Sequence, residues 1–169
     1  MIGDTKSRTR PRWLKWLGFG LVLLVLCLVS LRPAVAEDYN KRIMVGADFS
    51  HQDLRDSSFV KALLRNTDFS YANLEGVSFF GANLEGANLE GADLRNATLD
   101  TALVAKANLH NAILEGAYAY KAQFQGANVE GADFTDVVMR PDAQKLLCAT
   151  ASGTNPATGR PTRDTLFCP

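Results

Sequence analysis

The residues most able to do chemistry in this 169-residue sequence are two histidines and three cysteines. Neither His51 nor His110 has a second His or Cys at a spacing suited to zinc. The sequence also lacks a nucleophile-elbow serine, a phosphate-binding loop and a dinucleotide-binding glycine motif. It therefore predicts no catalytic residue, no metal ion and no cofactor, and we do not expect an enzyme.

The cysteines are expected to form a structural bond. Cys27 lies in an apolar N-terminal segment, which leaves Cys148 and Cys168 as an even pair in an exported chain. Such a pair is usually oxidised. A disulfide closing 20 residues would stabilise the fold by roughly 3 kcal/mol.

Residues 1–36 have the pattern of a signal peptide. They begin with several basic residues, continue with an uncharged run over residues 17–31, and end in Ala34-Val35-Ala36. We predict cleavage between Ala36 and Glu37; an uncleaved anchor is the alternative and the only expected route to a membrane. Without this segment the chain carries 17 acids and 12 bases, a net charge of about −5 that disfavours nucleic acid as a partner.

A period of five residues dominates the rest of the chain. Every fifth residue from Phe49 to Phe134 is apolar over eighteen registers, and the residue two positions earlier is Ala in fourteen of them. Helices repeat every 3.6 residues and strands every 2, so this period fits neither element. It predicts a coil with sides one pentad long, large and small apolar residues inside, and Asp, Asn and Gly at the turns.

The run from Ala82 to Leu94 (ANLEGANLEGADL) resembles the repeats of the pentapeptide-repeat family. The resemblance implies an all-β solenoid over residues 47–139, a right-handed quadrilateral β-helix of about four and a half coils. One coil cannot bury enough apolar surface to fold alone, so solenoids stack and cap their ends. We expect residues 37–46 to form an N-terminal cap and residues 140–169 to form a C-terminal capping helix and tail.

The C-terminal segment predicts a short helix that begins at Pro141 and ends before Gly153. With Cys148 and Cys168 paired, it would form a disulfide-clasped lid. The segment from Leu147 to Cys168 is also similar to the C-terminal signature of thylakoid-lumenal members of the family in cyanobacteria and plants. That similarity implies a cyanobacterial thylakoid lumen, with the periplasm as the alternative.

Four pentads per coil would stack residues twenty apart, which places several unusual residues on the outside. One predicted partner-binding patch consists of Val60, Leu63, Phe80, Leu103 and Tyr120. Alternatively, the tail or the N-terminal segment covers these side chains. A second stack, of Arg55, Glu75, Arg95 and Glu115, predicts a ladder of alternating charge. Ala119, at a position otherwise occupied by large residues, predicts a dent or a filled cavity.

The sequence thus favours a non-catalytic, exported scaffold or protein-interaction module with an unknown protein partner. The resemblance to thylakoid-lumenal members of the family further implies that this scaffold supports photosynthetic complexes in the lumen. One alternative is a DNA mimic that binds a topoisomerase, because residues 47–139 carry 13 acids against 6 bases. Another is a periplasmic enzyme acting on polysaccharide, although no paired-carboxylate cleft can be placed.

Overall fold

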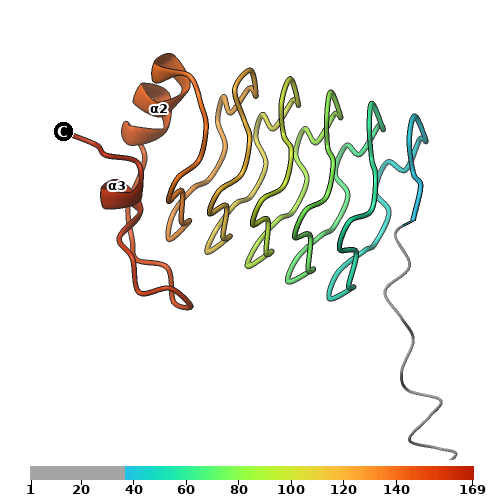
Figure 1. Ribbon diagram of the computed structural model, residues 1–169, viewed down its shortest axis with the longest axis horizontal. Coiled ribbons are helices and arrows are strands. Elements are labelled where there is room, and N and C mark those ends of the chain that lie inside the picture. The colour runs from blue at the N-terminus through green and yellow to red at the C-terminus, as the bar shows by residue number, and fades with distance from the viewer. Residues whose placement is uncertain (1–36) are drawn as a thin grey trace, which may run out of the picture. The chain divides into compact units, whose positions relative to one another are not determined.

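The computed structural model describes residues 37–169, which form a β-solenoid with two short helices at its C-terminal end (Figure 1). Parallel β-bridges join residues twenty apart, from Asp38–Ser58 to Tyr118–Val138. One turn of the solenoid therefore contains four pentads, as the repeats predict. Asp38 and Val138, the first and last bridged residues, are 100 positions apart, which makes five turns at twenty residues per turn.

The solenoid begins earlier than predicted. Asp38 and Ile43 bridge Ser58 and Leu63 in the pattern of all later pentads, so residues 37–46 belong to the first coil and are not a separate cap. The sequence hides this coil because Arg42 stands where later pentads have alanine. The predicted signal peptide and its cleavage after Ala36 lie outside the described residues.

Each pentad turns at the residue two positions after its central apolar side chain. This residue has a positive φ at glycine and non-glycine corners alike, with Lys121 as the exception, for example +58° at Lys41 and +61° at Gly91. At most corners its N–H donates to a carbonyl of the next coil, as Gly91 does to His110 at 2.8 Å. Gly91 is required for a second reason: a Cβ there would lie 2.6 Å from the Tyr71 ring, which covers this corner.

The interior follows the period of five. The central Leu and Phe side chains and their preceding alanines are buried, and phenyl rings of successive N-terminal coils stack at 5.2 Å, as in Phe49–Phe69 and Phe59–Phe79. Each buried Leu or Phe side chain contributes about 1.5–3 kcal/mol. Ala119 is fully buried, and its N–H donates to Val138 at 2.8 Å, so the repeat continues through this position.

The last coil is covered by helix α2 (Pro141–Cys148), helix α3 (Thr162–Thr165) and the loop between them. The short helix predicted after Pro141 is thus present, and Leu147 and Leu166 are 2% exposed where they pack on the core. Figure 1 shows both helices at the C-terminal end of the stack. Within residues 37–169, no helix has the length and apolar character needed to cross a membrane.

Candidate interaction surface

The residues of the predicted patch lie in two rows that run along the solenoid on either side of one corner. Val60, Phe80 and Tyr120 belong to one row, each a multiple of twenty residues from the next. Leu63 and Leu103 belong to the other, in which each residue bridges its counterpart in the next coil. The corner positions between the rows are Lys41, Lys61, Gly81, Thr101 and Lys121, and all but Lys121 have a positive φ.

The described tail does not cover this surface. Phe80 is 42% exposed and Tyr120 is 53% exposed, while Val60, Leu63 and Leu103 are half-buried. Hydrogen bonds from residues 149–169 reach only coil residues outside both rows, namely Asn111, Ala112, Glu115, Gly131 and Phe134. Helix α2 borders residues 121–125 of the last coil but leaves Tyr120 exposed. The patch is therefore open to a partner on the part of the molecule that the structure describes.

Two polar residues divide the patch. Asp100 lies between Phe80 and Tyr120, and its carboxylate accepts the Tyr120 N–H at 2.7 Å. Asn83 separates Leu63 from Leu103 in the other row. The patch consequently consists of one cluster around Val60 and a second around Tyr120, and is not a single continuous apolar area.

Sequence reasoning missed three exposed residues that extend these clusters. Ile43 is 77% exposed and bridges Leu63, Tyr118 is 52% exposed beside Tyr120, and Val138 is 47% exposed and bridges Tyr118. All three stand directly before a central apolar residue, where the motif prefers Asp or Asn. This position in the motif did not identify Ile43, because residues 37–46 were predicted to form a cap and not a repeat.

Charge is sorted between two halves of each coil. We call the stacked blocks 38–47, 58–67, 78–87, 98–107 and 118–127 the basic half, and the blocks 48–57, 68–77, 88–97, 108–117 and 128–137 the acidic half. The basic half has 6 Lys and Arg against 3 acids, and the acidic half has 2 Arg against 11 acids. The basic half also contains five of the six exposed large apolar residues in these blocks, the exception being Tyr71.

The tail is fixed to the acidic half by Asn155. Its fully buried side-chain amide donates to the carbonyls of Asn111, Ala112 and Gly131 at 2.9–3.2 Å. Its carbonyl oxygen accepts the N–H groups of Ala157 and Thr158 at 3.0 and 3.1 Å. This one side chain thus satisfies backbone groups of both the last coil and the tail.

Arg160 makes a second attachment to the acidic half. Its Nη2 lies 2.8 Å from Glu115 Oε2, and its Nε lies 3.2 Å from Oδ2 of the fully buried Asp133. Burial alone would raise the pKa of Asp133, but hydrogen bonds from the side chain and backbone of Thr135 and the Arg160 charge hold it below the ordinary value of 3.8. Asp133 is therefore ionised at neutral pH and paired with the tail.

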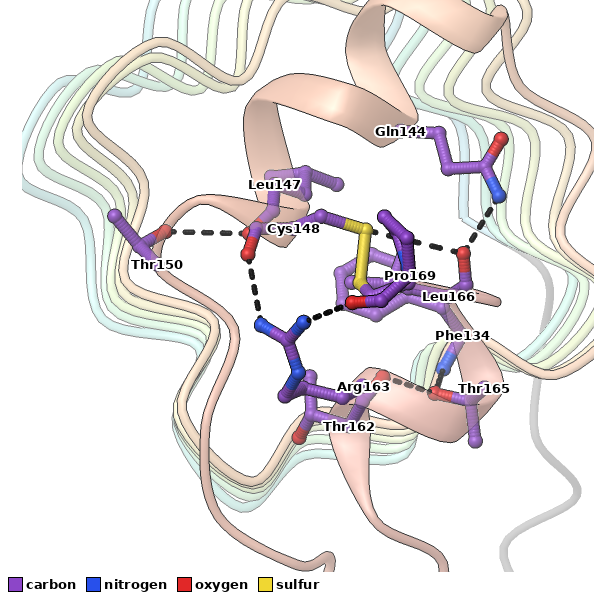
Figure 2. The surroundings of a disulfide bond; sticks show 11 residues. Phe134, Gln144, Leu147, Cys148, Thr150, Thr162, Arg163, Thr165, Leu166 and Pro169 are labelled. Atoms are coloured by element: carbon purple, nitrogen blue, oxygen red, sulfur yellow. Dashed lines mark hydrogen bonds between the residues drawn. A yellow bond between two sulfur atoms is a disulfide. The ribbon is translucent and has the colours of Figure 1, made fainter.

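The disulfide joins the end of α2 to the C-terminal residues (Figure 2). Cys148 and Cys168 are bonded, with their Cα atoms 5.5 Å apart. Around this bond, Gln144 donates to the Leu166 carbonyl at 2.6 Å, and Arg163 donates to the carbonyls of Cys148 and Pro169 at 3.2 and 2.7 Å. The predicted pairing is present, and the clasp closes the end of the solenoid.

The two histidines stay within the repeat. The His51 ring stacks on Tyr71 at 5.3 Å, and His110 Nε2 lies 3.0 Å from the Asn111 amide nitrogen. Among residues 37–169, no three His, Cys, Asp or Glu side chains form a cluster that could hold a metal ion.

Arg55, Arg95 and Glu115 of the predicted charge ladder pair with residues outside the ladder and not with one another. Arg55 pairs with Asp53 of its own pentad, at 2.8 Å, and Arg95 pairs likewise with Asp93. Glu115 pairs with Arg160 of the tail. The stack is in register, but an Asp two residues away in the same pentad offers a bidentate partner that the next coil does not.

These features define a β-solenoid built from twenty-residue turns. The sequence matches the family model for a pentapeptide repeat region over residues 38–109 and the model for pentapeptide repeats (8 copies) over residues 104–140. The chain belongs to the pentapeptide-repeat family.

A solved structure and a curated sequence from the Arabidopsis thaliana thylakoid lumen are similar to this chain. The crystal structure of a pentapeptide repeat protein from that compartment is 47% identical, has a TM-score of 0.76, and aligns over 77% of this chain and 90% of its own. Thylakoid lumenal 15 kDa protein 1, chloroplastic, is 56% identical over 36 residues, which are 21% of this chain and 16% of that protein. The match thus spans about a sixth of the latter's length.

A more distant similarity is to QnrB1, a plasmid-mediated fluoroquinolone resistance protein. It is 17% identical, with a TM-score of 0.36, over 69% of this chain and 72% of its own. This likeness carries no argument about function.

Proposed function

We propose that this protein is an exported, non-catalytic scaffold that binds another protein through the patch formed by Val60, Leu63, Phe80, Leu103 and Tyr120. The observation that carries the proposal is the concentration of exposed apolar side chains on the basic half of a rigid solenoid. Exposed apolar residues that gather on one side of a soluble domain are typical of interaction sites. The tail, which could have covered them, is fixed to the other half.

The proposed compartment is the thylakoid lumen, where the protein would support photosynthetic complexes; the periplasm is the alternative. Its support is the thylakoid-lumenal origin of the similar Arabidopsis structure and sequence. Fractionation of intact cells should recover the protein inside thylakoids. Recovery in the cytoplasm together with a topoisomerase would favour the DNA-mimic alternative and contradict both export and the scaffold.

The patch is tested by a photo-crosslinking residue placed at Phe80 in the full-length chain. We expect it to capture one defined protein in intact cells. The matched control is the same residue at Ser70, which occupies the equivalent pentad position in the acidic half. Equal capture from both positions, or none from Phe80, would contradict the proposed patch.

A further inference from the structure

Lysines line the corner that separates the two rows of the patch. Lys41, Lys61 and Lys121 occupy three of its five positions, and all three are exposed. Within residues 37–169 none of them forms an ion pair, whereas Arg55 and Arg95 of the acidic half are both paired. Unpaired positive charge therefore stands beside the exposed apolar residues.

We infer that the partner is a protein whose contact surface presents carboxylates around an apolar centre, and that Lys61 and Lys121 pair with those carboxylates. The inference rests on the proposed function and specifies the chemistry of its partner. Complementary charges at the edge of an apolar contact steer association and fix the orientation of the two proteins. Lys61 lies between Val60 and Leu63, and Lys121 directly follows Tyr120, so each cluster has its own lysine.

The net negative charge of the chain does not oppose this interaction. Opposite faces of a coil are separated by about 10 Å of packed side chains, and outward side chains add to this distance. The Debye length at physiological ionic strength is about 8 Å. A partner at the lysine corner therefore experiences chiefly the basic half, with 6 bases and 3 acids, and the 11 acids behind it are screened.

The shape of the surface favours a protein over an anionic lipid surface. The two rows lie on adjacent faces of the solenoid, and the lysines occupy the corner where those faces meet. A planar bilayer could contact only one face beside such a convex edge. A concave protein surface can contact Phe80 on one face and Leu63 on the other.

The test uses a zero-length carbodiimide, which condenses a lysine amine with a carboxylate to form an amide and release water. The carbodiimide takes up that water and becomes a urea. It is applied to intact cells that express the full-length chain. We expect Lys61 and Lys121 to be linked to Asp or Glu residues of the same protein that is captured at Phe80. Raising the salt concentration should reduce the yield of these links.

Two variants of equal net charge separate local from overall charge. Lys61→Glu/Lys121→Glu should weaken binding of the captured partner by about tenfold or more. Arg55→Glu/Arg95→Glu, a control on the acidic half, should leave binding within about twofold, because these exposed side chains are remote from the corner. Thermal unfolding of both variants verifies that the solenoid is intact.

The outcomes distinguish this inference from the proposed function. If Phe80 captures a partner that Lys61→Glu/Lys121→Glu binds as tightly, the inference is wrong and the scaffold remains. If the full-length chain instead binds phosphatidylglycerol vesicles and not phosphatidylcholine vesicles, with no protein linked to either lysine, the partner is lipid and the inference is wrong. If Phe80 captures no protein at all, the proposed function itself fails.

Discussion

The two halves of the solenoid differ in where their polar side chains find partners. In the acidic half, amides of successive coils form a chain of hydrogen bonds from Asn128 through Asn108 and Asn88 to Asp68, each 3.0–3.1 Å long. The same half holds all the direct hydrogen bonds that the tail loop makes to the coils. Both halves contain paired cations, Arg55 and Arg95 in the acidic half and Arg65 and Lys106, which share Glu85, in the basic half. In the basic half the corner lysines extend into solvent. The difference suggests that the acidic half stabilises the molecule and the basic half is available for binding.

The strongest test of this division concerns the clasp above the last coil. Cys148→Ala/Cys168→Ala removes a bond that closes 20 residues, so we expect the free energy of unfolding to fall by roughly 3 kcal/mol. Chemical denaturation measures this loss. Because Phe80 lies two coils before the last coil, photo-capture at this position should persist at temperatures where the variant remains folded. Loss of capture from the folded variant would show that the two regions are not independent.

A comparable effect is expected from Asn155→Ala. This change removes three hydrogen bonds to backbone carbonyls; the Ala112 carbonyl still accepts the Asp133 N–H, but those of Asn111 and Gly131 lose their partner, at a cost of about 2–3 kcal/mol. Asn83→Ala in the basic half is the control, because its side chain accepts only the Glu85 N–H, at 3.0 Å. Equal losses for both variants in urea denaturation would remove the distinction between the halves.

Asp133 predicts how stability depends on pH. Its pKa is held below 3.8 in the folded protein, so the unfolded chain binds the proton more readily. The resulting stabilisation is present above about pH 4 and is lost as the pH falls through the lowered pKa. Asp133→Asn should therefore reduce stability by about 1–2 kcal/mol at pH 7, and this deficit should shrink progressively as the pH falls below 3.8. A deficit that does not change with pH would contradict the ion pair with Arg160.

The smallest expected effect is at the patch itself. Phe80→Ala should change the free energy of unfolding by no more than about 0.5 kcal/mol, because the side chain is 42% exposed. Phe79→Ala is the matched control and should cost about 3–5 kcal/mol, because Phe79 is fully buried. A large loss for Phe80→Ala in denaturant titrations would mean that this residue supports the fold and is not reserved for binding.

The sequence predicted the features that follow from its period. An apolar residue at every fifth position determines which side chains enter the core, and twenty residues per turn determine which outward residues stack. The coil, the Cys148–Cys168 bond and the outward placement of Phe80 and Tyr120 follow from these two regularities.

The remaining features depend on contacts that the period does not encode. The pairing of Arg55 with Asp53 is a choice between two nearby carboxylates, made by side-chain geometry. The role of Asn155 depends on the path of an aperiodic loop, and nothing in its local sequence marks it as the residue that closes the last coil. Residues 37–46 were predicted to form a cap because their pentads depart from the motif, although their β-bridges are regular.

The central claim is that the basic half is the binding surface, and lysine labelling in intact cells tests it most directly. An amine-reactive reagent is applied to the protein in its native compartment and to the purified protein, and the labelling of each lysine is compared. Lys61 and Lys121 should be protected several-fold in the native compartment, whereas Lys145 of α2, exposed on the helix that covers the last coil, should be labelled equally in both. Equal labelling of Lys61 and Lys121 in the two samples would contradict the account.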